Sequence, residues 1–427
     1  MTEKILLQNG RLVDPTSKRD EIVDMLIVDG KIASIKSKIP ASSDYKTVDL
    51  SNKIIAPGFI DIHVHLREPG YEHKETIETG TRSAAYGGFT AVCCMPNTNP
   101  AIDDESIVTF IMTQGKKAHG GIVDVFPIAS VSKSREGKTL APIAELVHAG
   151  AVGLSDDGAP VSDANLMRRA LEYANMYNVP VMQHCEIPEL SHGGVMNEGR
   201  VSTELGLPGI PGVAEEIMIA RDLLLSEYTN SRYHVCHMST AVSVDLVRQA
   251  KKKGIKVTCE VTPHHFTVTE EIVRTYDTNT KMNPPLRTQK DVDAIKDGLK
   301  DGTIDVIATD HAPHSLDEKE VDYIQAPFGI VGLETAIGLS ITELVEKQFL
   351  TMNQLIEKFS VNPRKIIGKE IRIAEGEPAN LTFIDPNIVW DVEISKFNSK
   401  SKNSPFNGRT LKGKAVGICN NGKMILY

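Results

Sequence analysis

Short apolar runs alternate with helix-periodic segments from about Lys53 to Lys369. The runs read as buried strands, and the segments between them place apolar residues three and four positions apart, with Gly or Asn at several ends. Strands that alternate with helices predict a parallel sheet, and eight such pairs are typical of a (β/α)8, TIM-like barrel. An open doubly wound sheet is the alternative, but the first run lacks the glycine fingerprint of a dinucleotide-binding fold. The runs are GFIDIHVH, GFTAVCCMP, GIVDVFPIAS, AVGLSDD, VPVMQHCE, RYHVCHMS, IKVTCEVTP and IDVIATDHAPH.

The two ends of the chain show a different pattern. Residues 1–52 and 370–427 carry short alternating strands with Asp-Gly and Asn-Gly turns, which are typical of hairpins. Neither end is long enough to form a stable unit alone, so we expect them to meet in one composite β-sandwich domain beside a barrel domain at 53–369. The Ser/Asn/Lys-rich segment 395–405 predicts a mobile loop within that small domain.

Composition narrows the classes of function without changing this fold. The chain is 41% hydrophobic and 24% charged, which is typical of globular proteins. A net charge of −9 and the lack of a dense Lys/Arg block argue against nucleic-acid binding. The first residues lack an apolar signal segment and no window is apolar enough to span a membrane, so we expect a cytoplasmic protein. Its 6 cysteines form no C-x-x-C and predict buried thiols in a reducing compartment.

Imidazoles and carboxylates gather at the ends of five predicted strands. A single His there is usually a hydrogen-bonded rim residue, and a single Asp is usually a helix N-cap, a role that Asp156 could fill. His234 lies on the opposite face of its strand from His237 and is interpreted as a residue packed under a helix. Because the carboxyl ends of barrel strands meet at one rim, the remaining set predicts a shared site. Its members are His63, His65, Asp157, His184, His237 and Asp310.

This set predicts a pair of metal ions. Imidazoles and carboxylates are ligands that suit Zn²⁺, and six of them exceed what one tetrahedral ion takes. Two ions that share a bridging carboxylate would lower the pKa of the water between them toward about 7 and polarise a carbonyl group. A carboxylate at the edge of the cluster could then carry a proton from the hydroxide to a leaving nitrogen. Asp310 is the candidate, although it could also be a plain ligand.

Further polar residues at the same rim indicate what is bound. Arg67, Asn97, Asn283 and His314 offer a guanidinium, two amides and an imidazole, which suit a carboxylate together with ureide or imide groups. Asn97 and Asn283 could instead only shape turns. The run QAPFGIVG, residues 325–332, adds backbone N–H groups that could hold an anion. We therefore expect a small anionic ligand.

Several of these motifs resemble the longer bacterial class of the dihydroorotase family, in the amidohydrolase superfamily. The resemblance spans both ends of the chain, and HVHLREPG and DHAPH together are its most specific blocks. It implies a binuclear zinc enzyme that reversibly hydrolyses dihydroorotate to N-carbamoyl-aspartate in pyrimidine synthesis. The motifs that carry it are GFIDIHVHLREPG, MPNTNP, SDDG, QHCE, HVCHMST, NPPLR and ATDHAPH.

Carried over by motif, the resemblance implies a role for each rim residue. His63 and His65 would bind the first zinc, Asp157 would bridge, and His184 and His237 would bind the second. Many relatives bridge with a lysine, which GLSDDG lacks, and the choice of Asp157 over Asp156 depends on the resemblance alone. The remaining roles are Asp310 as ligand and acid/base, and Arg67, Asn97, Asn283 and His314 as substrate contacts, helped by His65 and by the backbone near Phe328 and Gly329.

Two other functions compete with this interpretation. An allantoinase or hydantoinase would use the same metals and reaction, but those relatives are expected to carry the lysine that is absent here. A metal-free relative that serves only as a structural partner of a carbamoyltransferase would have lost ligands, and none is lost. As partners we expect the small-molecule substrate, a second copy of the chain in a homodimer, and aspartate carbamoyltransferase as a further candidate.

Overall fold

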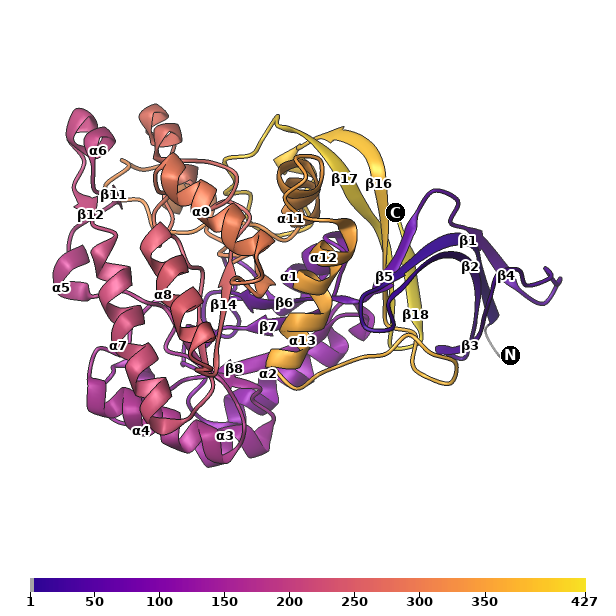
Figure 1. Cartoon of the computed structure of the whole chain (residues 1–427), viewed down its shortest axis with the longest axis horizontal. Coiled ribbons are helices and arrows are strands. Elements are labelled where there is room, and N and C mark those ends of the chain that lie inside the picture. Colours follow the sequence, from indigo (N-terminus) through magenta and orange to yellow (C-terminus); the bar gives the residue numbers. More distant parts are fainter. Residues whose placement is uncertain (1–3) are drawn as a thin grey trace.

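Eight parallel strands form a near-closed barrel in the computed structural model, which describes residues 4–427 (Figure 1). The sheet follows chain order from first strand to last, which confirms the predicted TIM-like barrel. A parallel bridge between Val64 and His311 joins the last strand to the first, and the His65 N–H donates to the His311 carbonyl at 2.8 Å. The strands are β6 (Phe59–Val64), β7 (Phe89–Cys94), β8 (Asp124–Ala129), β9 (Gly153–Leu154), β10 (Val181–Gln183), β13 (Tyr233–Val235), β14 (Val257–Val261) and β15 (Val306–Ile307).

Helices cover the outside of this barrel (Figure 1). Several of them begin at a capping side chain: Asp163 accepts from the Leu166 N–H and Thr240 from the Ser243 N–H. Their apolar faces pack on the strands, and buried apolar side chains lie on both faces of the sheet. The main helices are α1 (Ile77–Tyr86), α2 (Glu105–Lys117), α3 (Ile143–Ala149), α4 (Ala164–Met176), α7 (Val213–Thr229), α8 (Ala241–Lys252), α9 (Gln289–Lys300), α11 (Ala336–Ser340), α12 (Met352–Ile356) and α13 (Asn362–Ile366).

Short elements extend the loops at the carboxyl ends of the strands. After β10 the chain forms a two-stranded parallel sheet and two short helices before α7 begins. Another short helix follows β15. Among residues 4–427, no helix is both long enough and apolar enough to cross a membrane. These short elements are α5 (Pro188–Ser191), β11 (Met196–Asn197), α6 (Arg200–Leu205), β12 (Gly209–Ile210) and α10 (Leu316–Lys319).

Both ends of the chain share one mixed sheet beside the barrel, as predicted (Figure 1). The junction is β5, which pairs parallel with the first strand and antiparallel with β16, so the two ends are joined directly. Buried Leu, Ile and Met side chains of both ends form a core separate from that of the barrel. The strands are β1 (Lys4–Asp14), β2 (Arg19–Val28), β3 (Lys31–Lys36), β4 (Lys46–Asp49), β5 (Ile54–Pro57), β16 (Leu381–Asp391), β17 (Thr410–Asn420) and β18 (Lys423–Leu426).

The prediction of a mobile loop at 395–405 is wrong. Within it, residues 398–404, which we call the C-terminal strap, lie against the loops at the carboxyl ends of the barrel strands. Ser399, Ser401 and Asn403 are buried, whereas Lys400 between them is exposed. The polar side chains that suggested mobility instead form hydrogen bonds with backbone and carboxylate groups of the barrel. Such partners are expected, because a buried polar side chain needs a hydrogen-bond partner.

Candidate metal centre

The six side chains predicted as metal ligands lie together at the carboxyl ends of the barrel strands, and all are buried. His63 is the last residue but one of β6 and His65 follows the strand directly, His184 follows β10 directly, and His237 follows β13 by two residues. Asp157 and Asp310 lie three residues beyond β9 and β15. Strand ends that are far apart in sequence thus bring four imidazoles and two carboxylates to one place.

One group of possible metal-ligand atoms comes from the carboxyl ends of the first, fourth and eighth barrel strands. His63 Nε2 lies 3.2 Å from Asp157 Oδ1, and His65 Nε2 lies 3.5 Å from Asp157 Oδ2. Asp310 Oδ1 lies 3.0 Å from His65 Nε2 and 3.6 Å from His63 Nε2. Three of these residues, His63, His65 and Asp157, present donor atoms close enough to hold one metal ion.

A second group uses the same Asp157. Its Oδ1 lies 3.6 Å from His237 Nε2 and 3.9 Å from His184 Nδ1, and these two nitrogens are 3.0 Å apart. The three residues again form a buried cluster that could hold an ion. Since Asp157 belongs to both groups, it is the side chain placed to bridge two ions.

The atoms that face one another here fit metal ions. His63 Nε2 and Asp157 Oδ1 are buried and form no hydrogen bond with a described residue. Burial alone would raise the pKa of Asp157, but the charge of His63 and the nearby His237 imidazole hold it well below its usual value. A buried carboxylate that stays ionised among imidazole nitrogens is a ligand set for borderline divalent cations such as Zn²⁺.

The neighbouring Asp156 has different hydrogen-bond partners. Asp156 Oδ1 accepts from the N–H groups of Val131 at 2.9 Å and Ser132 at 3.0 Å, and its Oδ2 accepts from the Ser132 hydroxyl. The side chain therefore fixes the loop after β8 and points away from the imidazoles. Asp157, one residue later, lies among them.

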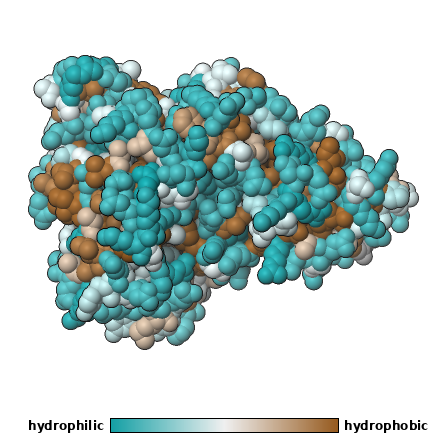
Figure 2. Space-filling model, viewed as in Figure 1, coloured by the Kyte–Doolittle hydropathy of each residue, from teal (hydrophilic) through white to brown (hydrophobic). Residues whose placement is uncertain are grey.

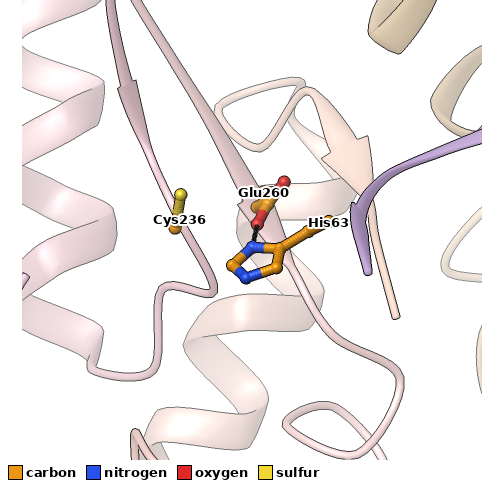
Figure 3. Close-up of side chains that lie close together, drawn as sticks. All are labelled: His63, Cys236 and Glu260. Atoms are coloured by element: carbon orange, nitrogen blue, oxygen red, sulfur yellow. Dashed lines mark hydrogen bonds and ion pairs between the residues drawn. The ribbon is translucent and has the colours of Figure 1, made fainter. Parts of the chain in front are cut away.

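Glu260, which the sequence analysis missed, lies behind His63 (Figure 3). Its Oε1 accepts from His63 Nδ1 at 2.5 Å, and its Oε2 accepts from His234 Nε2 at 3.1 Å. His234 Nδ1 in turn accepts from the Thr258 hydroxyl at 2.8 Å, so the prediction that His234 packs under a helix is wrong. Burial would raise the pKa of Glu260, but the charge of His63 and hydrogen bonds from both imidazoles lower it to about 2.

Cys236 lies beside this pair in the barrel interior (Figure 3). Burial raises the pKa of its thiol. His63 has only one nitrogen free of Glu260, and that nitrogen faces Asp157. His63, Cys236 and Glu260 are therefore better described as the support of the metal centre than as a separate metal site.

Two further imidazoles are held in the same way. His65 Nδ1 donates to Asn97 Oδ1 at 2.8 Å, and His184 Nε2 donates to Glu186 Oε2 at 2.9 Å. A metal-ligating histidine typically donates its other ring N–H to a carboxylate, amide or carbonyl oxygen, which fixes the ring orientation. Glu186 is the second residue that the sequence analysis missed, although it follows His184 by only two positions.

The predicted substrate contacts surround this centre at several points. Arg67 Nε donates to the Pro313 carbonyl at 3.2 Å, and His314 Nε2 donates to the Phe328 carbonyl at 2.8 Å. Asn283 Nδ2 donates to Glu186 at 2.5 Å and lies 3.4 Å from His184 Nε2. The Gly329 N–H donates to the Lys281 carbonyl at 2.9 Å, so that N–H is already occupied.

Three residues of the site have a backbone conformation that is rare for side chains other than glycine. The φ angles are 61° at Arg67, 30° at His237 and 49° at Asp310. Such conformations cost about 1–3 kcal/mol each and persist where the surrounding structure enforces them. At His237 the turn brings the imidazole to Asp157, although the preceding Cys236 also lies in the barrel interior.

Comparisons with known proteins agree with this geometry. A family model described as Dihydro-orotase-like matches residues 52–243. A dihydroorotase of Pelotomaculum thermopropionicum is 51% identical over 424 residues, which cover 99% of this chain and 98% of the relative. A dihydroorotase of Acetivibrio thermocellus is 49% identical over 423 residues, which cover 99% of each chain.

Solved structures show the same architecture. The L-hydantoinase of Arthrobacter aurescens superposes with a TM-score of 0.88 at 25% identity, covering 100% of this chain and 96% of that one. The dihydropyrimidinase of Brevibacillus agri gives a TM-score of 0.84 at 22% identity, with coverage of 99% and 95%, and shows a shared fold.

Proposed function

This chain belongs to the dihydroorotase family, and we propose that it catalyses the reversible hydrolysis of (S)-dihydroorotate to N-carbamoyl-L-aspartate, a step of de novo pyrimidine biosynthesis. The observation that carries the proposal is the shared position of Asp157 between two buried pairs of imidazoles, in a chain that matches dihydroorotases over its whole length.

The proposed cofactor is a pair of Zn²⁺ ions. His63, His65 and Asp310 would hold one ion, His184 and His237 the other, with Asp157 between them. Two bound ions would make hydroxide available at neutral pH and polarise the carbonyl of the cyclic amide. The partners behind the imidazoles, among them Glu260, fix the orientation of the rings that serve this purpose.

Asp310 is the proposed general acid/base. It is positioned by its contact with His65, and it lies at the edge of the donor cluster rather than between the two pairs of imidazoles. In hydrolysis its carboxylate takes the proton from the attacking water and delivers it to the ring nitrogen as the C–N bond breaks. In ring closure the same carboxylate takes the proton from the carbamoyl nitrogen, so one residue serves both directions.

Arg67 is the proposed partner of the substrate carboxylate. Its Nε is used by the Pro313 carbonyl, and its terminal Nη groups form no hydrogen bond with another residue in the described part of the chain. A guanidinium presents two parallel N–H groups to a carboxylate, which supports this role. Asn97, Asn283, His314 and the backbone of Phe328 and Gly329 are the remaining proposed contacts, joined by His65.

A single experiment separates this function from its rivals. Metal analysis of the purified protein is combined with turnover measured on dihydroorotate and on allantoin. We expect about two zinc ions per chain and hydrolysis of dihydroorotate alone. Preferred hydrolysis of allantoin would identify another cyclic amidohydrolase, and an inactive protein without metal would favour a structural partner of a carbamoyltransferase.

The proposed setting is the cytoplasm, with a homodimer as the proposed assembly and aspartate carbamoyltransferase as a further candidate partner. Exposed apolar residues lie over α5 and α7 and support a contact between copies there (Figure 2). Sedimentation of the purified chain, alone and with aspartate carbamoyltransferase, tests both assemblies. The residues concerned are Leu190, Val213, Ile217, Leu224 and Tyr228.

A further inference from the structure

The C-terminal strap connects loops that carry proposed substrate contacts. It comes from the end of the chain that forms the terminal sheet, between β16 and β17, and crosses the carboxyl ends of the barrel strands. Ser399, Ser401 and Asn403 alternate inward, with the lysines between them turned outward or partly exposed. This alternation is that of an extended segment with one side against the barrel.

Two acids of the barrel, the buried Glu75 and the half-buried Glu334, anchor the first part of the strap. Glu75 accepts from the Lys400 N–H at 3.1 Å and from the Ser399 hydroxyl. Glu334 accepts from the N–H groups of Asn398 at 2.7 Å and Ser399 at 3.1 Å. These charge-assisted bonds fix the register in which the following residues meet the loops.

Asn403 sits between the loop after β15 and the loop at 326–332. Its Nδ2 donates to the carbonyls of Ala312 and Gly329, both at 3.0 Å, and its Oδ1 accepts from the His314 N–H at 3.1 Å. Its own carbonyl accepts from the Val331 N–H at 2.9 Å. With 5% of its surface exposed, it is a buried amide whose two donors go to two different loops.

The two loops also meet directly, because the Ala312 N–H donates to the Ile330 carbonyl at 2.8 Å and His314 Nε2 donates to the Phe328 carbonyl at 2.8 Å. Gly329 packs so closely that an added Cβ would lie 2.7 Å from the Ala312 Cβ and 3.3 Å from His314 Nε2. The amide adds one bond to the His314 N–H and one to the Gly329 carbonyl at this close contact, and so supports the spacing between His314 and the Phe328–Gly329 backbone, two of the proposed contacts of dihydroorotate. Among the described residues, the side chain of Asn403 forms no hydrogen bond with any of the six proposed metal ligands.

We infer that Asn403 is a positioning residue for substrate binding, which holds His314 and the Phe328–Gly329 backbone in the geometry that receives dihydroorotate. This inference rests on the proposed function. It predicts an effect on substrate affinity without an effect on the metal centre, because the amide reaches the substrate loops and not the metal ligands.

The test compares Asn403→Ala with wild type and with Asn407→Ala. Asn407 is exposed, lies on the same connection and accepts only from the Ile394 N–H at 3.1 Å, so its loss should change little. In Asn403→Ala three buried backbone groups lose their partner, and we expect KM for dihydroorotate to rise on the order of tenfold or more, with a smaller change in kcat and unchanged metal content. Asn403→Asp, which keeps the acceptor but loses both donors, should be similarly impaired.

A KM within about twofold of wild type in a folded Asn403→Ala protein, or a fall in kcat alone, would overturn the inference. Amide hydrogen exchange gives a second readout that needs no activity. We expect faster exchange at 312–315 and 326–332 in the variant, and unchanged exchange there would also overturn it. Where the alanine variant does not fold, Asn403→Ser is measured in its place, since its hydroxyl can still make one of the bonds.

The two proposals fail separately. If wild-type protein does not hydrolyse dihydroorotate, the proposed function is wrong, and the exchange experiment still decides whether Asn403 joins the two loops. If wild type is active and Asn403→Ala binds dihydroorotate normally, only the inference on Asn403 is wrong.

Discussion

Replacing Glu260 with glutamine should weaken zinc binding while the barrel stays folded. The carboxylate accepts from His63 at 2.5 Å and from His234 at 3.1 Å, one imidazole on each oxygen. Glutamine has nearly the same shape but offers one acceptor oxygen and one NH2 group. One of the two imidazoles must therefore face a donor, and His63 loses either its hydrogen bond or the negative charge that strengthens it, which weakens the hold that turns its Nε2 toward Asp157.

The size of the effect follows from the bond that is lost. A buried hydrogen bond to a charged group contributes about 1.5–3 kcal/mol. At about 1.4 kcal/mol for each factor of ten, this corresponds to roughly a 10- to 150-fold loss of affinity. Changes to the partner of a metal-ligating histidine typically cost about 10- to 100-fold, which agrees. We expect the zinc dissociation constant to rise within this range.

The assay is a competition for zinc between the protein and a chromophoric chelator. Glu343→Gln is the matched control, because Glu343 is also a buried acid, which accepts from Lys296, Lys347 and Arg409 and from no proposed ligand. It should lower the free energy of unfolding and leave zinc affinity unchanged. Equal zinc affinity in Glu260→Gln and wild type, with both proteins folded, would refute the argument that Glu260 supports the centre through His63.

Three further outcomes are expected. Asp310→Asn should abolish turnover while dihydroorotate still binds, and near-normal turnover would remove Asp310 from proton transfer. Arg67→Ala should weaken dihydroorotate binding by about 1.5–3 kcal/mol. The control Arg82→Ala, on the surface of α1, should leave this binding unchanged. An unchanged KM in Arg67→Ala would exclude Arg67 as the carboxylate partner. Burial and the nearby Lys281 lower the pKa of Lys319 to about 7 from 10.5. Between these values the unfolded chain binds the proton that the folded chain lacks, so this residue makes the free energy of unfolding rise with pH, by up to about 1.4 kcal/mol per unit. Urea unfolding from about pH 7.5 to 9.5 should show a smaller rise in Lys319→Met, and an identical slope would contradict this pKa.

The barrel could be predicted from the sequence because its signals are local. Each strand is an apolar run and each helix an adjacent periodic segment, and ligand-type residues at the strand ends need only the rule that these ends share a rim. His63 and His65 could be predicted as ligands in this way. Even the sheet shared by the chain ends follows from two flanks that are each too short to stand alone.

What could not be predicted depends on contacts between residues far apart in sequence. Glu260 is a single acid in the apolar run VTCEVTP, which indicates that it needs a buried partner. The sequence around it does not indicate that the partners are His63 and His234. Which of Asp156 and Asp157 faces the imidazoles, and how the chain turns at His237, depend on backbone angles. The alternation of side chains along a strand does not reveal these angles. The strap was missed because Ser, Asn and Lys favour loops whether or not they are buried.

The sheet that unites the two ends of the chain also sets the order in which a newly synthesised molecule can mature. The Phe59 N–H donates to the Thr382 hydroxyl, 323 residues later, and β5 pairs with β16 over a similarly long separation, with Pro57 opposite Leu381. A nascent chain that has been synthesised as far as Asp310, just beyond β15, already contains every proposed metal ligand, but it lacks the strand that flanks β5 and the strap that spans the loops. Translation must therefore proceed through β16 before β5 and Phe59 acquire their final partners, so this step of assembly follows the synthesis of the proposed ligands.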